Sequence, residues 1–243
     1  MAIFDDLEAE QDRLHGTLAG LSEDQWTAGS SAAGWSVTDV VLHLAQTEEA
    51  VVASVDSGLP VRPQGSGLSV DEMADLMVRS QRAAPAEVFR RWQDARVAAV
   101  AALRSADPAV PLSWIDAPLK PATMATTRLA EHWAHTLDIT RPLGLDLPDT
   151  DRLRHIAWLA HRSLAYAFAI SGQEARPVYC ELTAPDGVQI WRFGPAEAES
   201  RITGAAGAFC RVAAQRLAPE ESGLVAEGPY GAAALGVLRT YAA

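Results

Sequence analysis

The stretch Arg128-Leu-Ala-Glu-His-Trp-Ala-His-Thr-Leu-Asp138 carries the residues on which the predicted fold and chemistry of this chain depend. It lies in a run with helical spacing, residues 122–140. In such a helix Glu131 and His135 are one turn apart and Asp138 follows at i+7, so the three side chains project from one face. The stretch therefore predicts a helix with metal-ligating residue types along one side.

A divalent metal site is the functional interpretation of this pattern. An imidazole and a carboxylate one turn apart let one helix supply two ligands to one ion, and a third imidazole from a facing helix closes a tripod with open positions. His43 is the natural third ligand, whereas His132 is expected to point elsewhere. The plain alternatives are a surface Glu–His pair and a histidine satisfied in the core, and both are common.

Further helices are predicted on both sides of this stretch. One starts where Ser36 and Asp39 have the spacing of a capping box, and another where Ser69 and Glu72 repeat it. The predicted helices cover 4–18, 37–57, 69 onward, 86–103, 122–140 and 150–170. Four or more long helices joined by short loops are typical of a helical bundle.

The hydrophobic period changes after Gly172. Two strand-like runs flank Asp186-Gly187, a dipeptide that favours a hairpin turn. The predicted elements here are strands at 178–183 and 188–193, a helix at 202–217, a short strand at 223–227 and a closing helix at 231–241. We therefore predict an α+β chain, with a helical bundle over residues 1–173 followed by a small α+β domain over residues 174–243.

The charge of the chain excludes several classes of partner. Lys and Arg number 20 against 31 Asp and Glu, which gives a net charge of −11, and the sequence has no dense basic cluster. Nucleic acid and anionic membrane surfaces need concentrated positive charge, so neither is expected as a partner. The longest apolar runs fall well short of the roughly 20 residues that cross a bilayer. A small-molecule substrate is the expected partner.

Cysteine content and the first residues indicate the compartment. The N-terminus is acidic where a secretory signal is basic. Cys180 and Cys210 are too few for a disulfide framework and fall on apolar positions, so we expect buried packing residues rather than nucleophiles. These features favour a cytoplasmic protein, either a monomer or a homodimer.

Four further side chains have two interpretations each. Asp138 either orients His135 or is a solvated carboxylate. Arg216, at the end of the predicted helix 202–217, either binds a substrate carboxylate or is an exposed helix-terminal arginine. Trp35 and Trp133 flank the proposed ligands, and they either wall the pocket or belong to the core.

Two stretches and the tail resemble one known family. The stretch Gly34-Trp-Ser-Val-Thr-Asp-Val-Val-Leu-His-Leu-Ala45 resembles the helix of the DinB-like, mycothiol-dependent maleylpyruvate isomerase family that carries the first metal ligand. Residues 128–138 resemble the family's Glu-x-x-x-His helix, which carries the other two. The tail is similar to the small C-terminal domain of a metal-binding branch, through Glu181-Leu-Thr-Ala-Pro-Asp-Gly, Arg201-Ile-Thr-Gly and Val225-Ala-Glu-Gly-Pro.

This resemblance implies a fold, a metal and a cofactor. The fold is a DinB-type four-helix bundle that holds a divalent ion, commonly zinc, through His43, Glu131 and His135, followed by an α+β domain that helps to close the cleft. By ligand type alone the site also suits nickel, iron or manganese. Family members use mycothiol, the low-molecular-weight thiol of actinobacteria. A composition rich in Ala and Gly, with Lys120 as the only lysine, is consistent with such a high-GC source.

The implied chemistry is that of an activated thiol. A metal with open positions binds a thiol as the thiolate, which can add reversibly to an electron-poor alkene or displace a leaving group. This is isomerase or S-transferase chemistry on a small electrophilic metabolite. The branch with this tail resembles relatives of unassigned substrate, some of them in natural-product pathways.

Two competing functions remain open from the sequence. The same metal can act without thiol as a Lewis acid in a cyclase, hydrolase or lyase of specialised metabolism. Alternatively, the metal is structural and the chain binds a small ligand without catalysis.

Overall fold

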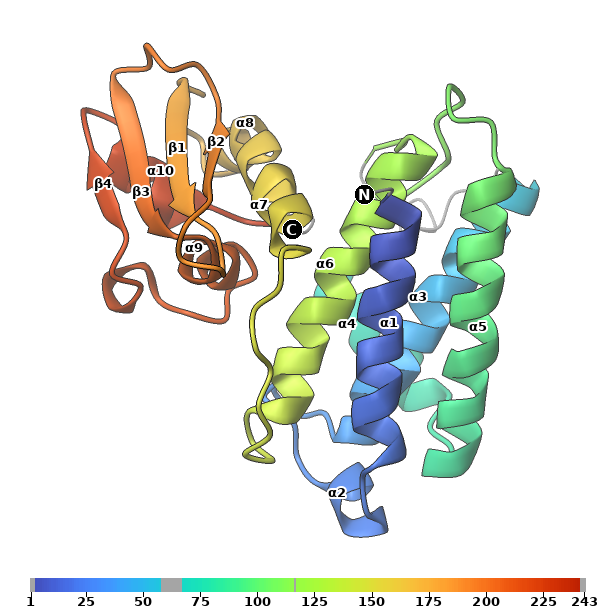
Figure 1. Cartoon of the computed structure of the whole chain (residues 1–243). Helices are drawn as coiled ribbons and strands as arrows, with labels where there is room; N and C mark the ends of the chain where they lie inside the picture. The colour runs from blue at the N-terminus through green and yellow to red at the C-terminus, as the bar shows by residue number, and fades with distance from the viewer. Residues whose placement is uncertain (1–2, 58–66, 116, 241–243) are drawn as a thin grey trace. The chain divides into compact units, whose positions relative to one another are not determined.

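The structure is a computed structural model that describes residues 3–57, 67–115 and 117–240. The chain divides into two compact units, the first reaching Leu147 and the second beginning at Pro148. Helices α1 to α6 belong to the first unit, and the remaining helices and all four strands belong to the second (Figure 1). Among the residues described, no helix is both long enough and apolar enough to cross a membrane.

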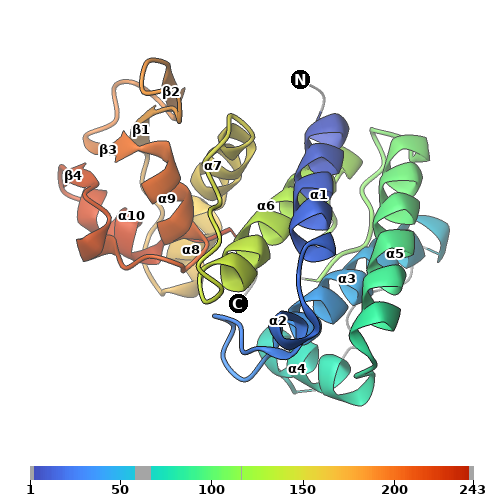
Figure 2. The ribbon, with the colours of Figure 1, turned by 60° about the horizontal axis from the view of Figure 1, so that its bottom comes forward.

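The first unit is a four-helix bundle with two short additional helices. Helices α1 and α3 each pack against both α5 and α6, and α4 packs on α3 (Figures 1 and 2). The bounds are α1 Ile3–Ala19, α2 Glu23–Thr27, α3 Val37–Ser57, α4 Val70–Ser80, α5 Pro85–Ser105 and α6 Pro121–Thr140. The predicted bundle helices are confirmed here to within a few residues.

The helix starts follow the capping chemistry of the sequence. At α3 the Ser36 amide donates to Asp39 Oδ2 (3.0 Å) and the Asp39 amide donates to Ser36 Oγ (3.1 Å). Ser69 and Glu72 make the same reciprocal pair at α4. On α3 the apolar side chains of one stripe are fully buried, namely Val37, Val40, Val41, Leu44 and Val51. The capping box therefore sets where α3 begins, and the apolar stripe sets which face of α3 is turned to the core.

The second unit is a small sheet covered by helices. Its strand order is β2-β1-β3-β4, with β1 and β3 parallel and the two other pairs antiparallel. Helix α9 packs on β1 and β3, and α10 packs on β3 and β4. The bounds are α7 Leu153–Arg162, α8 Leu164–Ile170, β1 Val178–Thr183, β2 Ile190–Phe193, β3 Ser200–Ala205, α9 Ala206–Ala213, the 3₁₀ turn Pro219–Glu221, β4 Val225–Glu227 and α10 Gly231–Val237.

The predicted boundary at residue 173 differs from the division at Leu147 and Pro148. The predicted helix over 150–170 is two helices that meet at Ser163, and α7 packs against α9 of the second unit. Arg211 of α9 also donates to both carboxylate oxygens of Asp149, at 2.8 and 2.7 Å. Helical periodicity shows that a segment has an apolar face, but not which partner covers that face.

The predicted helix 202–217 is wrong at both ends. Residues up to Ala205 form β3, whose register beside β1 pairs Cys180 with Ile202. The helix that follows ends at Ala213, because Gln215 adopts a left-handed φ of 58° and the Arg216 amide donates back to the Arg211 carbonyl (2.8 Å). This is a Schellman-type end, so Arg216 lies beyond the helix rather than within it.

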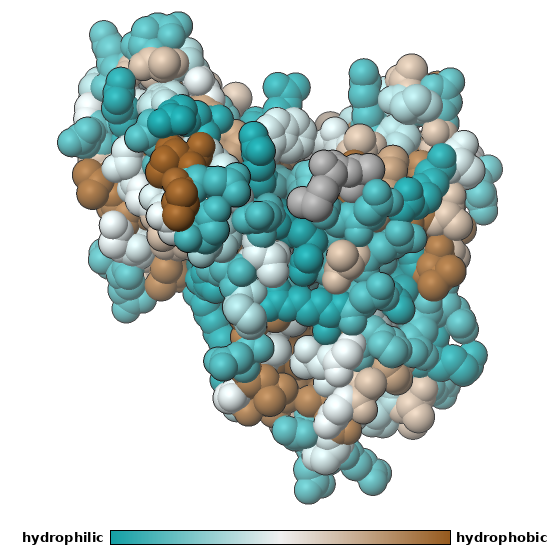
Figure 3. Space-filling model, in the orientation of Figure 1, coloured by the Kyte–Doolittle hydropathy of each residue, from teal (hydrophilic) through white to brown (hydrophobic). Residues whose placement is uncertain are grey.

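Polar residues dominate the visible surface (Figure 3). The face shown in Figure 3 is mostly hydrophilic, with apolar residues in small separate patches. Isolated exposed apolar side chains of this kind are normal for a globular protein.

Candidate metal centre

The structure brings His43, Glu131 and His135 together where α3 packs against α6. One ligand atom from each lies within 4.8 Å of the others. Glu131 Oε2 is 3.4 Å from His135 Nε2 and 3.9 Å from His43 Nε2. We call these three residues the tripod.

The tripod is largely enclosed but reachable from solvent. The side chains of His43, Glu131 and His135 are 14%, 27% and 11% exposed. Two imidazoles and one carboxylate are a donor set that zinc and other divalent ions accept. Three protein ligands with partial exposure leave coordination positions open, as catalytic sites require.

Asp138 orients the imidazole of His135. His135 Nδ1 lies 2.9 Å from Asp138 Oδ2, and Asp138 is 1% exposed. When the proton is on Nδ1, His135 presents the lone pair of Nε2 to the other two tripod residues, His43 and Glu131. Asp138 is therefore not a solvated carboxylate, which was the other interpretation of the sequence.

The electrostatics favour the metal-binding forms of Glu131 and His43, whereas His135 has to release a proton before it can bind a metal. Burial opposes ionisation of Glu131, but the nearby imidazoles of His135 and His43 outweigh it and hold the pKa of this carboxyl well below its usual value. Burial lowers the pKa of His43. Burial also opposes the charged form of His135, yet the hydrogen bond to Asp138 and the nearby Glu131 carboxylate raise its pKa. Glu131 is thus a carboxylate and His43 a neutral imidazole, the forms that bind metals.

A buried ion pair lies one helical turn from the tripod, and the sequence interpretation missed it. Arg128 Nε donates to Glu48 Oε1 (2.9 Å), and Arg128 Nη2 donates to Thr47 Oγ1 (2.7 Å). Arg128 is 2% exposed and Glu48 is 0% exposed. The sequence does contain one indication of this pair. Glu48 falls on the apolar stripe of α3 between Leu44 and Val51, and a charged side chain at a buried position needs a partner of opposite charge.

His132 points away from the tripod, as the helical spacing indicates. Its Nε2 accepts from Trp92 Nε1 (3.2 Å), and its Nδ1 donates to the Arg128 carbonyl (2.9 Å). Burial lowers the pKa of His132 to about 3. His132 is therefore a neutral core histidine with both ring nitrogens satisfied.

The two flanking tryptophans differ in environment. The Trp35 ring lies 5.1 Å from the His43 ring, centroid to centroid, and its Nε1 donates to Asp75 Oδ1 (3.1 Å). Trp133 is 1% exposed and belongs to the core. Trp35 therefore contacts a tripod residue.

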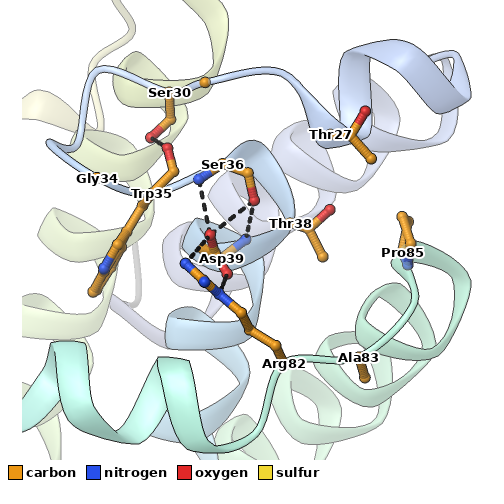
Figure 4. Close-up of a pocket in the computed structure, with 11 residues that line it drawn as sticks. Thr27, Ser30, Gly34, Trp35, Ser36, Thr38, Asp39, Arg82, Ala83 and Pro85 are labelled. Carbon is orange, nitrogen blue, oxygen red and sulfur yellow. Dashed lines mark hydrogen bonds and ion pairs between the residues drawn. The ribbon is translucent and has the colours of Figure 1, made fainter.

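A pocket of about 560 Å³ opens at the start of α3 (Figure 4). Arg82 donates from Nε and Nη2 to the two carboxylate oxygens of Asp39, at 2.8 and 2.9 Å. Figure 4 shows this pair beside Ser36, so the charges in the pocket already satisfy one another. The lining described includes Trp35 but none of the tripod residues.

The family of mycothiol maleylpyruvate isomerase N-terminal domains matches residues 7–140, more than half of the chain and all of the tripod. The chain belongs to this family. Two uncharacterized proteins of Mycobacterium tuberculosis, from two strains, are each 35% identical over 224 residues, which cover 88% of this chain and 84% of the relative.

Solved structures show the same fold. A crystal structure of the mycothiol-dependent maleylpyruvate isomerase matches with a TM-score of 0.64 at 14% identity, covering 93% of both chains. A histidine-to-alanine mutant of that enzyme matches with a TM-score of 0.63 at 13% identity and the same coverage. This likeness confirms the predicted α+β class, with a DinB-type bundle followed by a small α+β domain.

The other residues that the sequence analysis singles out, Arg216 and the two cysteines, lie in the second unit. Arg216 Nη1 donates to the Ala214 carbonyl (2.7 Å), and its role in binding a substrate carboxylate stays a prediction. Cys180 and Cys210 are buried. Burial raises the pKa of Cys180 to about 12 and also raises the pKa of Cys210. Both cysteines are packing residues, as the sequence predicts.

Proposed function

We propose that this chain is a metal-dependent, mycothiol-using isomerase or S-transferase that acts on a small electrophilic metabolite. The observation that carries this proposal is the tripod of His43, Glu131 and His135, with Asp138 behind it, in a member of the mycothiol maleylpyruvate isomerase family.

The tripod fits a divalent ion in donor type and in charge. Glu131 and Asp138 carry two negative charges between them when the imidazoles are neutral, which matches a dication. The Arg128–Glu48 pair nearby adds no net charge. When bound, such an ion supplies Lewis acidity, which lowers the pKa of a coordinated thiol and so provides a nucleophilic thiolate at neutral pH. Zinc is the ion we propose first.

The thiol has to come from solution. The chain has two cysteines, and both are buried with a raised thiol pKa. A buried, protonated thiol is a poor nucleophile. Mycothiol, which names the family, is therefore the thiol that we propose.

We assign separate roles at the site to five residues of the chain and to Arg216. His43, Glu131 and His135 hold the ion, and Asp138 keeps His135 in the tautomer that presents Nε2. Trp35 lies against His43 and shields that side of the imidazole from water. We further propose that Arg216 binds a carboxylate of the substrate through its guanidinium.

Metal content and thiol dependence test this proposal. We expect elemental mass spectrometry to find about one metal ion per wild-type chain and none in a His43→Ala, His135→Ala double variant. His155→Ala, a histidine change in the second unit, is the control and should keep its metal. Electrophile turnover should then require both the metal and mycothiol.

Two results contradict the proposal. A wild-type chain that takes up no metal after reconstitution with zinc would exclude the metal centre. Turnover that needs the metal but proceeds equally without thiol would favour the Lewis-acid alternative.

A further inference from the structure

We propose that Arg128 is a positioning residue, which fixes the tripod by joining the two helices that carry its ligands. This inference rests on the proposed function, because it assigns a purpose to residues around the same metal centre.

The tripod exists only while α3 and α6 keep one register. His43 comes from α3, whereas Glu131 and His135 come from α6. Ligand distances in a metal site tolerate only a few tenths of an ångström, so a small slide of one helix along the other would open the set. Something at this level must therefore hold the two helices in place.

Arg128 lies on the same face of α6 as the ligands. It precedes Glu131 by three residues and His135 by seven, which places the three side chains in one row along the helix. From there its guanidinium reaches across to α3. Arg128 Nη2 donates to Thr47 Oγ1 (2.7 Å), and the Thr47 hydroxyl is shared between the His43 and Leu44 carbonyls, each at 3.0 Å. Two consecutive hydrogen bonds thus lead from α6 to the backbone of the α3 ligand.

A second hydrogen bond from the Arg128 guanidinium fixes the orientation of this group. Arg128 Nε donates to Glu48 Oε1 at 2.9 Å, and the two side chains are 3% and 0% exposed. Because Thr47 and Glu48 are adjacent on α3, the planar guanidinium engages one turn of α3 at two points. A planar fork held at two points defines orientation as well as distance.

A third helix joins at the same level. The Arg128 carbonyl accepts from His132 Nδ1, and His132 Nε2 accepts from Trp92 Nε1 of α5. Helices α3, α5 and α6 are therefore connected through polar contacts within one layer of the core.

Stability alone does not account for this ion pair. Removing two charges from water costs about as much as their attraction returns, and apolar side chains of equal volume often serve as well or better. A buried guanidinium that is bound at two points instead favours one relative position of the helices over others. Glu48 also neutralises Arg128, so the guanidinium can lie one turn from a dication without repelling it.

The decisive variants change the Thr47 link and leave the ion pair in place. Thr47→Val removes the hydroxyl with little change in shape, and Thr47→Ser keeps it. Each full-length variant is stripped of metal and titrated with zinc against a chromophoric chelator, and each is loaded with cobalt for its visible spectrum. We expect Thr47→Val to weaken zinc binding by about tenfold, in line with other residues that orient ligands, and to alter the cobalt spectrum. Thr47→Ser should match the wild type in both.

A double variant removes the fork without leaving an unpaired buried charge. Glu48→Gln with Arg128→Met should fold, because both partners of the pair are neutral, and it should lose more zinc affinity than Thr47→Val. The matched control is Asp149→Asn with Arg211→Met, an ion pair of the second unit. That control can lower the melting temperature, but it should leave zinc affinity and the cobalt spectrum unchanged.

The outcomes separate this inference from the proposed function. If the wild type binds zinc and both Thr47→Val and the double variant match its affinity and spectrum, Arg128 has no positioning role. If the wild type itself binds neither zinc nor cobalt, the metal centre fails and the inference fails with it.

Discussion

His135 and Asp138 lie one turn apart on α6, and the 2.9 Å contact from His135 Nδ1 to Asp138 Oδ2 is nearly closed to water. The contact is short enough for a charge-assisted hydrogen bond. It fixes which ring nitrogen of His135 faces His43 and Glu131. The contact that orients one proposed ligand thus lies within the same helix that carries two of the three proposed ligands.

Replacing Asp138 should weaken the metal site without unfolding the bundle. Asp138→Asn keeps the shape of the side chain but removes the charge that supports the imidazole. We expect zinc affinity to fall by about 10- to 100-fold, the usual effect of losing such a partner. A chelator competition titration measures this, and Asp146→Asn, on an exposed loop residue of the same unit, is the control. Equal affinity in Asp138→Asn and wild type would contradict the orienting role.

The two cysteines should be inert in the folded chain. Cys180 and Cys210 are buried, and burial raises both thiol pKa values. We expect a disulfide reagent such as DTNB to detect no fast-reacting thiol at neutral pH in the native protein, and two after denaturation. Cys180→Ala should also retain thiol-dependent turnover. Rapid reaction of either native cysteine would show that a nucleophile of the chain itself had been overlooked.

The tripod is predictable from sequence because helical spacing encodes it. Glu131 and His135 share a face on any helix that includes both, and a capped helix around His43 supplies the third ligand. The buried pair beneath it is not predictable in the same way. Glu48 and Arg128 lie 80 positions apart in sequence, and they can pair only when α3 packs against α6.

The errors have a related cause. Residues 202–205 are predicted as the first turn of a helix, yet they pair with β1. Strand pairing is a contact between distant residues, and a short apolar run does not distinguish strand from helix. The division between the two units also differs from the predicted boundary, and α7 packs against α9 within the second unit.

Acid should weaken the start of α3 through Asp39. Burial opposes its charge, but hydrogen bonds from Arg82 and Ser36 lower the pKa of Asp39 below its ordinary value of 3.8. The unfolded chain therefore binds this proton more readily, and the contribution of Asp39 to stability is complete above pH 3.8 and is lost as the pH falls through the lower folded value. At pH 7, Asp39→Asn should cost about 1 kcal/mol through the weakened cap.

Urea unfolding of wild type and Asp39→Asn from pH 7 down to pH 3 measures this dependence. The difference in unfolding free energy between the two proteins should be constant near neutrality and shrink in acid. A difference that stays constant down to pH 3, or that grows in acid, would show that Asp39 is not stabilised as a carboxylate.

Two glycines of the second unit should respond in opposite directions to alanine. A Cβ at Gly207 of α9 would overlap Asp149 Oδ2 and lie 2.7 Å from Arg211 Nη1, so it has to displace the Asp149–Arg211 ion pair. We expect Gly207→Ala to destabilise the chain by up to about 1 kcal/mol, because the displaced ion pair is partly exposed and lies at the ends of two flexible side chains. Gly236 of α10 has nothing within 4 Å of the added carbon. Gly236→Ala should therefore be neutral or stabilise by up to about 1 kcal/mol, because alanine is the better helix former. Urea unfolding of both variants checks the pair, and equal effects would mean that the close approach of α9 to Asp149 is not rigid.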